Sequence, residues 1–243
     1  MKNLVMALGL STALAAGAAS ANSFNTGLAL GVGHAKAKVS NSGDIDVANG
    51  NIRAGKRESA MNGVVGGVFA GWSTTLVEGD MPVHAGVELA FDMSGVKGRS
   101  DLSVNRAAAN SDALTMSIKR KNSIQMLGLI GTTFGGAKVD LRLGYDSSKF
   151  DIKTNATEVA AVSSKNKKSK RLNGVVVGLG VSGKVTEAMT LGLTYDYTMF
   201  GTLKADTMSV AGVAGVANNA RTRVKMKVKP SMGVAKIRFG YHF

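Results

Sequence analysis

Charged side chains recur at regular spacing inside four apolar stretches of the chain. Within a stretch they lie two or four residues apart, and these positions share one face of a β-strand. If the strands enclose a common interior, these charges would meet there. They would have to pair, because an unpaired buried charge costs several kcal/mol. The set comprises Glu88, Asp92, Lys138, Asp140, Arg142, Asp196, Lys236 and Arg238.

Two kinds of chemistry suit such an interior network. In the first, the network is a structural plug, with Arg142 and Arg238 each meeting two carboxylates. In the second, the same acids and bases form a pathway for protons or ions. The sequence favours the plug, because a small closed barrel has an interior only wide enough for side chains to fill.

Catalytic and metal chemistry have few candidates. The chain has three histidines, His34, His84 and His242, and no Cys. No His stands beside a Ser or Asp at a spacing that suggests a base and a nucleophile, and the histidines are too scattered for a metal cluster. We expect no catalytic residue, no metal and no cofactor. His34 lies at an outward-facing position of its expected strand, where its side chain would meet lipid. A lipid-modifying enzyme therefore stays an alternative.

The elements that carry these residues alternate apolar and polar side chains with period two, which is typical of half-buried β-strands. From Met189 to Met199, for example, apolar side chains alternate with Thr, Gly and Asp. The pattern predicts eight strands, at about 23–36, 61–73, 83–94, 122–134, 138–146, 172–184, 189–199 and 231–243.

The connections between these strands alternate in length. Short links are expected at 74–81, 135–136 and 183–188, and long polar links at about 38–60, 95–121, 151–171 and 202–229. Short turns on one side and long loops on the other are typical of an outer-membrane barrel. Recruiting 101–120 as an extra hairpin would raise the count to ten strands.

A soluble β-sandwich also alternates apolar and polar residues, so period alone does not decide the fold. Three features favour a barrel: the asymmetry of the loops, the glycines on the polar face, and aromatic residues near the short-turn side, where membrane interfaces favour them. These aromatics are Phe24, Trp72, Phe134, Tyr241 and Phe243. We therefore predict an all-β fold, an eight-stranded antiparallel up-and-down transmembrane β-barrel, whose last strand pairs with the first.

The N-terminus has the pattern of a secretory signal peptide. Lys2 is followed by an apolar run from Leu4 to Leu14 and by the small residues Ala19-Ser20-Ala21. We expect residues 1–21 to be a signal peptide and residues 22–243 a single outer-membrane barrel domain. The expected location is the bacterial outer membrane, reached by export through the periplasm.

The formal net charge is +14, and much of the positive charge falls in the expected long loops. An exported barrel does not routinely meet nucleic acid, so we expect none as a partner. Simple solubility is one interpretation; contact with lipopolysaccharide or with acidic host-surface glycans is the other. The clustered residues are Lys165, Lys167, Lys168, Lys170, Arg171, Arg221, Arg223, Lys225, Lys227 and Lys229.

The last residues, "IRFGYHF", resemble the carboxy-terminal signal of bacterial outer-membrane barrels. The stretch "LGLTYDYTMFGT" (191–202) is similar to the penultimate strand of small barrels of the OmpA-like transmembrane class. The resemblance implies that the barrel assembly machinery recognises Ile237, Phe239, Tyr241 and Phe243. We expect no peptidoglycan-binding domain after the barrel, and therefore no peptidoglycan tether.

These features together predict an integral outer-membrane protein with a structural or surface-interaction, adhesin-like role through four long basic extracellular loops. We expect a monomer that contacts outer-membrane lipid and lipopolysaccharide. A small porin-like channel is the alternative function, and a lipid A-modifying enzyme is the third class.

Overall fold

The computed structural model describes residues 22–42, 56–104, 112–157, 163–210 and 222–243. The expected signal peptide, residues 1–21, lies outside these ranges and stays a prediction. The strands are β1 (Asn22–Ser42), β2 (Lys56–Val77), β3 (Val83–Ser94), β4 (Lys97–Val104), β5 (Asp112–Phe134), β6 (Ala137–Thr157), β7 (Ser163–Lys184), β8 (Met189–Phe200), β9 (Leu203–Val210) and β10 (Thr222–His242).

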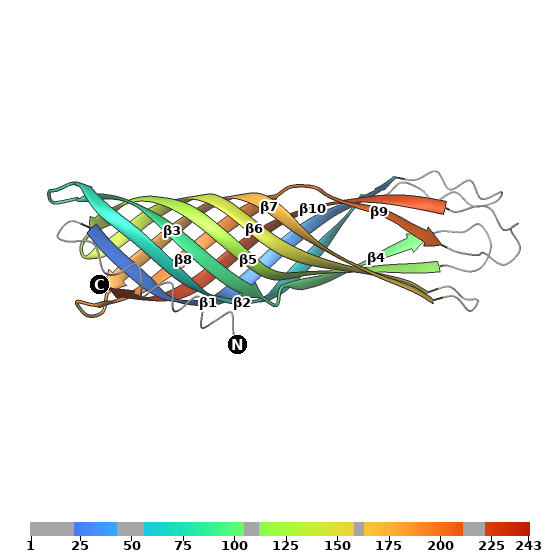
Figure 1. Ribbon diagram of the computed structural model, residues 1–243, viewed down its shortest axis with the longest axis horizontal. Coiled ribbons are helices and arrows are strands. Elements are labelled where there is room, and N and C mark those ends of the chain that lie inside the picture. Colours follow the sequence, from blue (N-terminus) through green and yellow to red (C-terminus); the bar gives the residue numbers. More distant parts are fainter. Residues whose placement is uncertain (1–21, 43–55, 105–111, 158–162, 211–221) are drawn as a thin grey trace, which may run out of the picture.

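The ten segments form the eight strands that cross one barrel, and we call each of these eight a stave. The counts differ because two staves are each interrupted once. Only Gly95 and Val96 separate β3 from β4, and only Gly201 and Thr202 separate β8 from β9. Neighbouring staves pair antiparallel, and β1 pairs with β10 along its length, so the sheet closes on itself (Figure 1). The predicted eight-stranded antiparallel barrel is therefore confirmed. No helix among the described residues is long and apolar enough to cross a membrane.

One end of the barrel carries the short turns, and we call it the turn end. The tightest turn is Gly135-Gly136, where both residues have positive φ, 57° and 82°. A two-residue hairpin whose backbone twist matches its strands needs such angles, and glycine adopts them without steric cost. The C-terminus lies at this same end (Figure 1).

The strands are longer than the sequence pattern predicted. The ranges 38–60, 95–121, 151–171 and 202–229 were expected to be long loops, but most of their described residues belong to strands. This prediction is wrong because period two continues there with a sparser apolar row, as at Met116 and Ile118 or at Phe150 and Ile152. Only 43–55, 105–111, 158–162 and 211–221 remain between strands at this end, and they lie outside the described residues.

The alternative of a ten-stranded barrel fails for a related reason. Residues from 101 to 120 do belong to two paired strands, β4 and β5. These segments prolong staves that already cross the barrel instead of adding two new ones. Likewise β10 continues through Pro230, which lies opposite Ala37.

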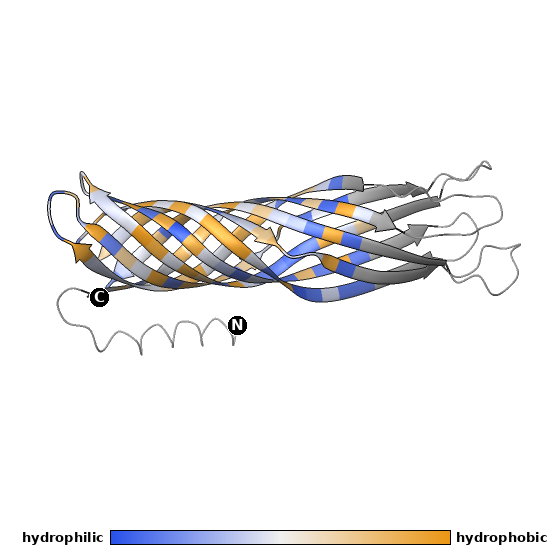
Figure 2. Cartoon of the chain, turned by 90° about the horizontal axis from the view of Figure 1, so that it is seen from above, coloured by the Kyte–Doolittle hydropathy of each residue, from blue (hydrophilic) through white to orange (hydrophobic). Residues whose placement is uncertain are grey.

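The two halves of the barrel bury different faces. Near the turn end the outward side chains are apolar and exposed, as on β8 from Met189 to Met199. Toward the opposite end the apolar side chains turn inward and form one buried cluster, and the outward positions become polar (Figure 2). Its members are Ala35, Ala37, Val39, Met61, Val65, Val96, Met116, Ile118, Phe150, Ile152, Leu172, Phe200, Leu203, Val228, Met232 and Val234.

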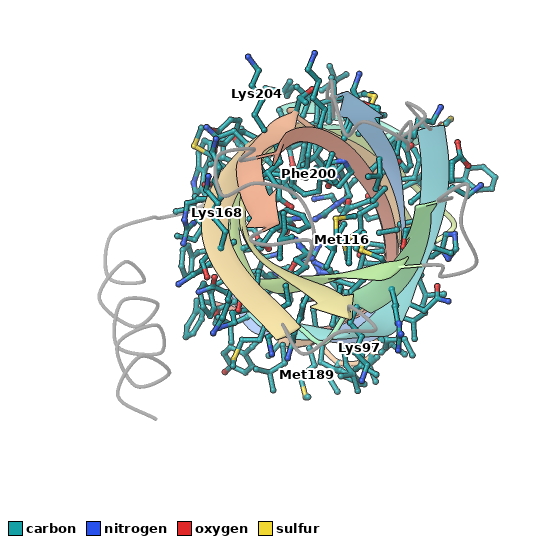
Figure 3. The ribbon with its side chains drawn as sticks, turned by 90° about the vertical axis from the view of Figure 1, so that its right-hand side faces the viewer. Lys97, Met116, Lys168, Met189, Phe200 and Lys204 are labelled. Carbon is teal, nitrogen blue, oxygen red and sulfur yellow. The ribbon has the colours of Figure 1, made fainter. Side chains whose placement is uncertain are left out.

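The sheet also changes connectivity in this outer half. β7 pairs with β8 only from Gly174 onward, and β2 meets β4 at the single pair Asn62↔Lys97. Beyond these points the recorded pairings join β9, β10, β1 and β2 on one side and β4, β5, β6 and β7 on the other. Two four-stranded sheets thus enclose the apolar cluster, and Phe200 and Met116 project between them (Figure 3).

Candidate functional site

Arg142 is the centre of the interior charge network. From β6 its Nε donates to Asp196 Oδ1 on β8, and its Nη2 donates to Glu88 Oε1 on β3, each at 2.8 Å. All three side chains are buried. The predicted contact between Arg142 and two carboxylates is present, and it joins three staves across the lumen.

Two further cations complete this layer from β10. Arg238 Nη2 donates to Glu88 Oε2 at 2.6 Å, and Lys236 Nζ donates to Asp92 Oδ2 at 2.7 Å. Arg238 was expected to meet two carboxylates, but among the described residues it forms a salt bridge with Glu88 alone. Its guanidinium carbon instead lies 3.7 Å from the centroid of the Phe69 ring, where a cation–π contact satisfies its other face.

This ionic layer is balanced in charge. Three cations (Arg142, Lys236 and Arg238) face three carboxylates (Glu88, Asp92 and Asp196). The remaining predicted pair, Lys138 and Asp140, lies nearer the turn end at 3.6 Å with Lys138 partly exposed. All eight predicted interior residues therefore face the lumen, and the balance is what a buried network requires.

A second ionic cluster was not predicted. Arg120 Nη2 donates to Asp146 Oδ2 at 2.9 Å and to Ser123 Oγ at 2.7 Å, and Gln125 Nε2 donates to the same Asp146 oxygen at 2.8 Å. Arg120 had been placed in a basic loop. A register shift between Arg120 and Ser123 reverses the inward parity of β5, so strict alternation could not assign Arg120 to the lumen.

Among the described residues, the larger space in the lumen lies at the turn end. A cavity of about 590 Å³ is lined there by turn residues such as Gly136 and Glu187, and it reaches inward to Arg142 and Arg238. Between Asp92, Lys236 and Arg238 the free volume is about 10 Å³, room for about one water molecule. The apolar cluster lies beyond this layer. The aqueous space is thus a vestibule that ends on the ionic layer.

The predicted basic residues lie on strands, not on loops. Lys165, Lys167, Lys168, Lys170 and Arg171 belong to β7, and Arg223, Lys225, Lys227 and Lys229 belong to β10. Arg221 lies outside the described residues. Where the side chains are described, at Lys167, Lys168, Lys170, Arg171, Lys227 and Lys229, they are exposed.

The predicted assembly residues form one outward row on β10. Ile237, Phe239 and Tyr241 are exposed on the outer surface, and the Phe243 amide donates to Phe24 O at 3.1 Å on β1. The Phe243 ring lies 4.9 Å from that of Tyr241 and 5.9 Å from that of Phe24. The last strand therefore joins the seam that closes the barrel.

The histidines have hydrogen-bonding partners. His34 Nδ1 lies 2.6 Å from Asn62 Oδ1 on the outside, and His84 contacts the hydroxyls of Thr75 and Thr133 in the vestibule. His242 Nδ1 lies 2.9 Å from Ser23 Oγ. Within the described ranges no group of three or more His, Cys, Asp or Glu is arranged to hold a metal ion. The expectation of no metal and no cofactor stays a prediction.

Solved outer-membrane proteins resemble this chain in fold. The protein OprG from Pseudomonas aeruginosa has 14% identity and a TM-score of 0.47, with 92% of this chain and 96% of OprG covered. The protease OmpT from Escherichia coli has 9% identity and a TM-score of 0.45, with 91% and 97% covered. Ail, the attachment invasion locus protein of Yersinia pestis, has 10% identity and a TM-score of 0.34, with 90% and 99% covered.

These TM-scores are below 0.5, so the structural likenesses carry no argument about activity. No significant match was found among curated proteins. The family model described as "Outer membrane protein beta-barrel domain" matches residues 6–243, which is nearly the whole chain. The chain belongs to this family, and it is an integral β-barrel protein of the bacterial outer membrane.

Proposed function

We propose that this protein is a closed barrel with a structural and surface-interaction role, and that it does not conduct. The observation that carries the proposal is the filled lumen, in which the balanced ionic layer around Arg142 is followed by a buried apolar cluster. Ions would have to displace paired charges and then enter a region without polar partners. Both steps are costly in a low-dielectric interior.

The outer half supplies the surface for interaction. By the family's usual topology the turn end faces the periplasm, so the two-sheet half projects outside the cell. Its outward positions carry many lysines, including Lys38, Lys97, Lys119 and Lys204, with exposed side chains. The basic surface is therefore presented by rigid strands close to the membrane. Lipopolysaccharide and acidic host-surface glycans are the partners that its charge suits, and nucleic acid is not expected.

The terminal strand has a proposed role in assembly. Ile237, Phe239, Tyr241 and Phe243 would be read by the barrel assembly machinery before β10 pairs with β1. The support is the exposed apolar row together with the contact of Phe243 with Phe24 at the closing seam. We further propose a monomer without catalytic activity; His34, the candidate for a lipid-modifying enzyme, is paired with Asn62.

Replacing Arg238 by Ala tests the closed-barrel proposal. The variant removes one of the two bases that pair with Glu88, and a hydrogen bond to a charged group is worth about 1.5–3 kcal/mol. We expect lower heat resistance on unheated gels and unchanged, near-zero conductance in planar bilayers. Glu78→Gln, in the exposed turn between β2 and β3, removes a charge that does not line the cavity, and should change neither readout.

The vestibule is the one feature that favours the alternative of a small pore. It is open to the periplasm, holds about 590 Å³ and is lined by Lys138, Asp140 and Arg238. If the unaltered protein shows stable conductance steps that Arg238→Ala changes, the vestibule would be the entrance of a channel and the closed-barrel proposal would be wrong.

A further inference from the structure

Like charges lie directly opposite one another across several strand pairs of the outer half. Such pairs destabilise a sheet in water, because the two side chains are only about 5 Å apart at Cβ. The pairs are Lys38↔Lys229, Lys97↔Lys119, Lys149↔Arg171, Lys153↔Lys167 and Lys204↔Lys227. Glu58 lies 3.6 Å from Lys38 and offsets the repulsion there. A bound anion would offset the repulsion at the other pairs.

The repulsion is most concentrated on the sheet formed by β4, β5, β6 and β7, which we call the β4–β7 face. Asp151 is the only carboxylate among the described outward side chains of this face, and Lys121 already pairs with it at 3.0 Å. The outward cations around it are Lys97, Lys119, Lys121, Lys149, Lys153, Lys167 and Arg171. The face therefore has a large excess of positive charge that the chain itself does not neutralise.

Protection of exposed sheet edges does not account for this charge. Lysines on edge strands prevent unwanted pairing with other chains, and β4 and β7 are edges of their sheet in the outer half. However, Lys119 lies on β5 and Lys149 and Lys153 lie on β6, and both of these strands are paired on both sides. The interior strands thus carry the same excess as the edges.

The height of the β4–β7 face places it at the lipid headgroups. On β6 and β7 the last exposed apolar pair is Tyr145↔Val175, followed by the neutral pair Ser147↔Asn173 and then by Lys149↔Arg171. At the usual rise and tilt of barrel strands, Lys149 lies about 10 Å beyond Tyr145 along the barrel axis. The headgroup region extends about 5–8 Å beyond the hydrocarbon, and long basic side chains reach back toward it.

We propose that the β4–β7 face binds the phosphate groups of phosphorylated lipid in the outer leaflet. This proposal rests on the closed-barrel function above and names the partner of its basic surface. Phosphates between Lys97 and Lys119, or between Lys149 and Arg171, convert each repulsive pair into two attractive contacts. A like-charge pair also occurs on the opposite sheet, at Lys204↔Lys227, so lipid that surrounds the barrel fits better than one soluble partner docked on one side.

The test uses the purified full-length mature protein in neutral detergent, with lipopolysaccharide whose lipid A carries both phosphates as the probe. Lys97→Gln and Lys149→Gln each remove one member of a like-charge pair at the height of the headgroups, and neither side chain forms a salt bridge among the described residues. Without lipid, each variant should melt at the same temperature as the unaltered protein or higher, because repulsion falls. With lipid, each variant should bind about 5-fold more weakly, the equivalent of about 1 kcal/mol for one basic residue at an anionic surface.

The expected result is therefore a reversal of sign: the substitutions stabilise, or leave unchanged, the lipid-free protein and destabilise the lipid-bound one. Lys184→Gln, on the periplasmic side, is the matched control and should show no reversal. Equal protection by lipid A without phosphates would overturn the proposal. Equal protection by a soluble sulfated polysaccharide would overturn the lipid source and assign the face to an acidic glycan. Neither outcome bears on conductance, which tests the closed barrel separately.

Discussion

Arg142 shows how a single side chain organises the interior of the barrel. Its guanidinium donates to both Asp196 and Glu88, and Glu88 in turn accepts from Arg238. Removing one member of such a chain leaves a buried partner uncompensated, which typically costs 3–5 kcal/mol when the pair is fully buried. The network therefore adds side-chain links across the lumen among β3, β6, β8 and β10.

Asp151, which lies outside the membrane, should make the stability of the protein depend on pH. The Ser169 hydroxyl donates to Asp151 Oδ1 at 2.5 Å and Lys121 lies 3.0 Å away, so the pKa of this carboxyl is lowered from its ordinary 3.8. Lys119 and Lys167 are the other cations facing it from β5 and β7. A lowered pKa means that Asp151 stabilises the fold above about pH 3.8 and loses this effect as pH falls through the lowered value.

Asp151→Asn should therefore be less stable than the unaltered protein at pH 7, and the difference should disappear near pH 2. Chemical unfolding in detergent, measured by tryptophan fluorescence at several pH values, checks this. Ser117→Ala, on the same face but away from the carboxylate, is the control. A difference that persists unchanged at pH 2 would contradict the role given to the carboxylate.

The interior residues were predictable where strand parity is constant, and unpredictable where it breaks. Glu88, Arg142 and Asp196 follow from alternation alone. Arg120 does not, because the register shift before Ser123 adds residues on one strand only. Which acid pairs with which base also could not be predicted, since the pairing depends on the distances between strands across the lumen. Arg238, for example, contacts the aromatic ring of Phe69 in place of a second carboxylate.

At the scale of the element, the long strands place exposed edges outside the membrane. Above the membrane, β2, β4, β7 and β9 lack a backbone-ladder partner on one side over most of their length, although the Ser59 hydroxyl of β2 donates to Arg99 O of β4 at 3.2 Å. These edges would invite pairing with another chain, and β7 carries lysines at Lys167, Lys168 and Lys170 that discourage it. Lysine thus serves two purposes: protection on the edges, and excess charge on the interior strands.

The end of the terminal strand leads to a prediction about assembly into the outer membrane. Deleting Phe243 removes its backbone bond to Phe24 and the last outward aromatic residue of β10. We expect a several-fold lower yield in the outer-membrane fraction, because both closure and the proposed assembly signal depend on this end. Phe134→Ala removes an exposed aromatic side chain from the periplasmic end of β5 and should leave the yield unchanged. Normal yield of the deletion would contradict the assembly role.

The number of staves was predictable from sequence, but their length was not. Period-two patterns with frequent apolar residues, as in 189–199, identify a strand that faces lipid. In 112–121 and 148–153 the apolar row is sparse and the other positions are strongly basic, a composition that resembles a loop. These segments form strands because the small inward residues and Met116, Ile118, Phe150 and Ile152 meet across the lumen in a common core.

The whole molecule combines two solutions to the burial of apolar surface. In the membrane the apolar side chains face lipid, and the run from Met189 to Met199 spans about 25 Å, the height of the hydrocarbon-facing band of such barrels. Outside the membrane the same strands form two sheets around an apolar core, as a soluble sandwich does. The sandwich alternative considered from sequence therefore describes the outer half, although it is wrong for the fold as a whole.

The ionic layer and the apolar core are two consecutive barriers to ions along the lumen, and each can be removed separately by substitution. The ionic-layer variant replaces Glu88, Arg142, Asp196 and Arg238 by Ala, which removes two acids and two bases and leaves the net charge unchanged. The core variant replaces Phe200 and Met232 by Ala. Phe200 packs edge-on against Phe150 at 5.1 Å, so its loss opens a cavity and costs about 3–5 kcal/mol.

We expect neither variant alone to conduct, because the remaining barrier still excludes hydrated ions, and we expect their combination to show conductance steps in planar bilayers. The reason is that the ionic layer and the apolar core lie one after the other along the same lumen, so an aqueous path needs both to be opened. Heat-modifiable mobility on gels shows that each variant is folded before its conductance is measured. Conductance from the ionic-layer variant alone would mean that the apolar core does not close the outer half.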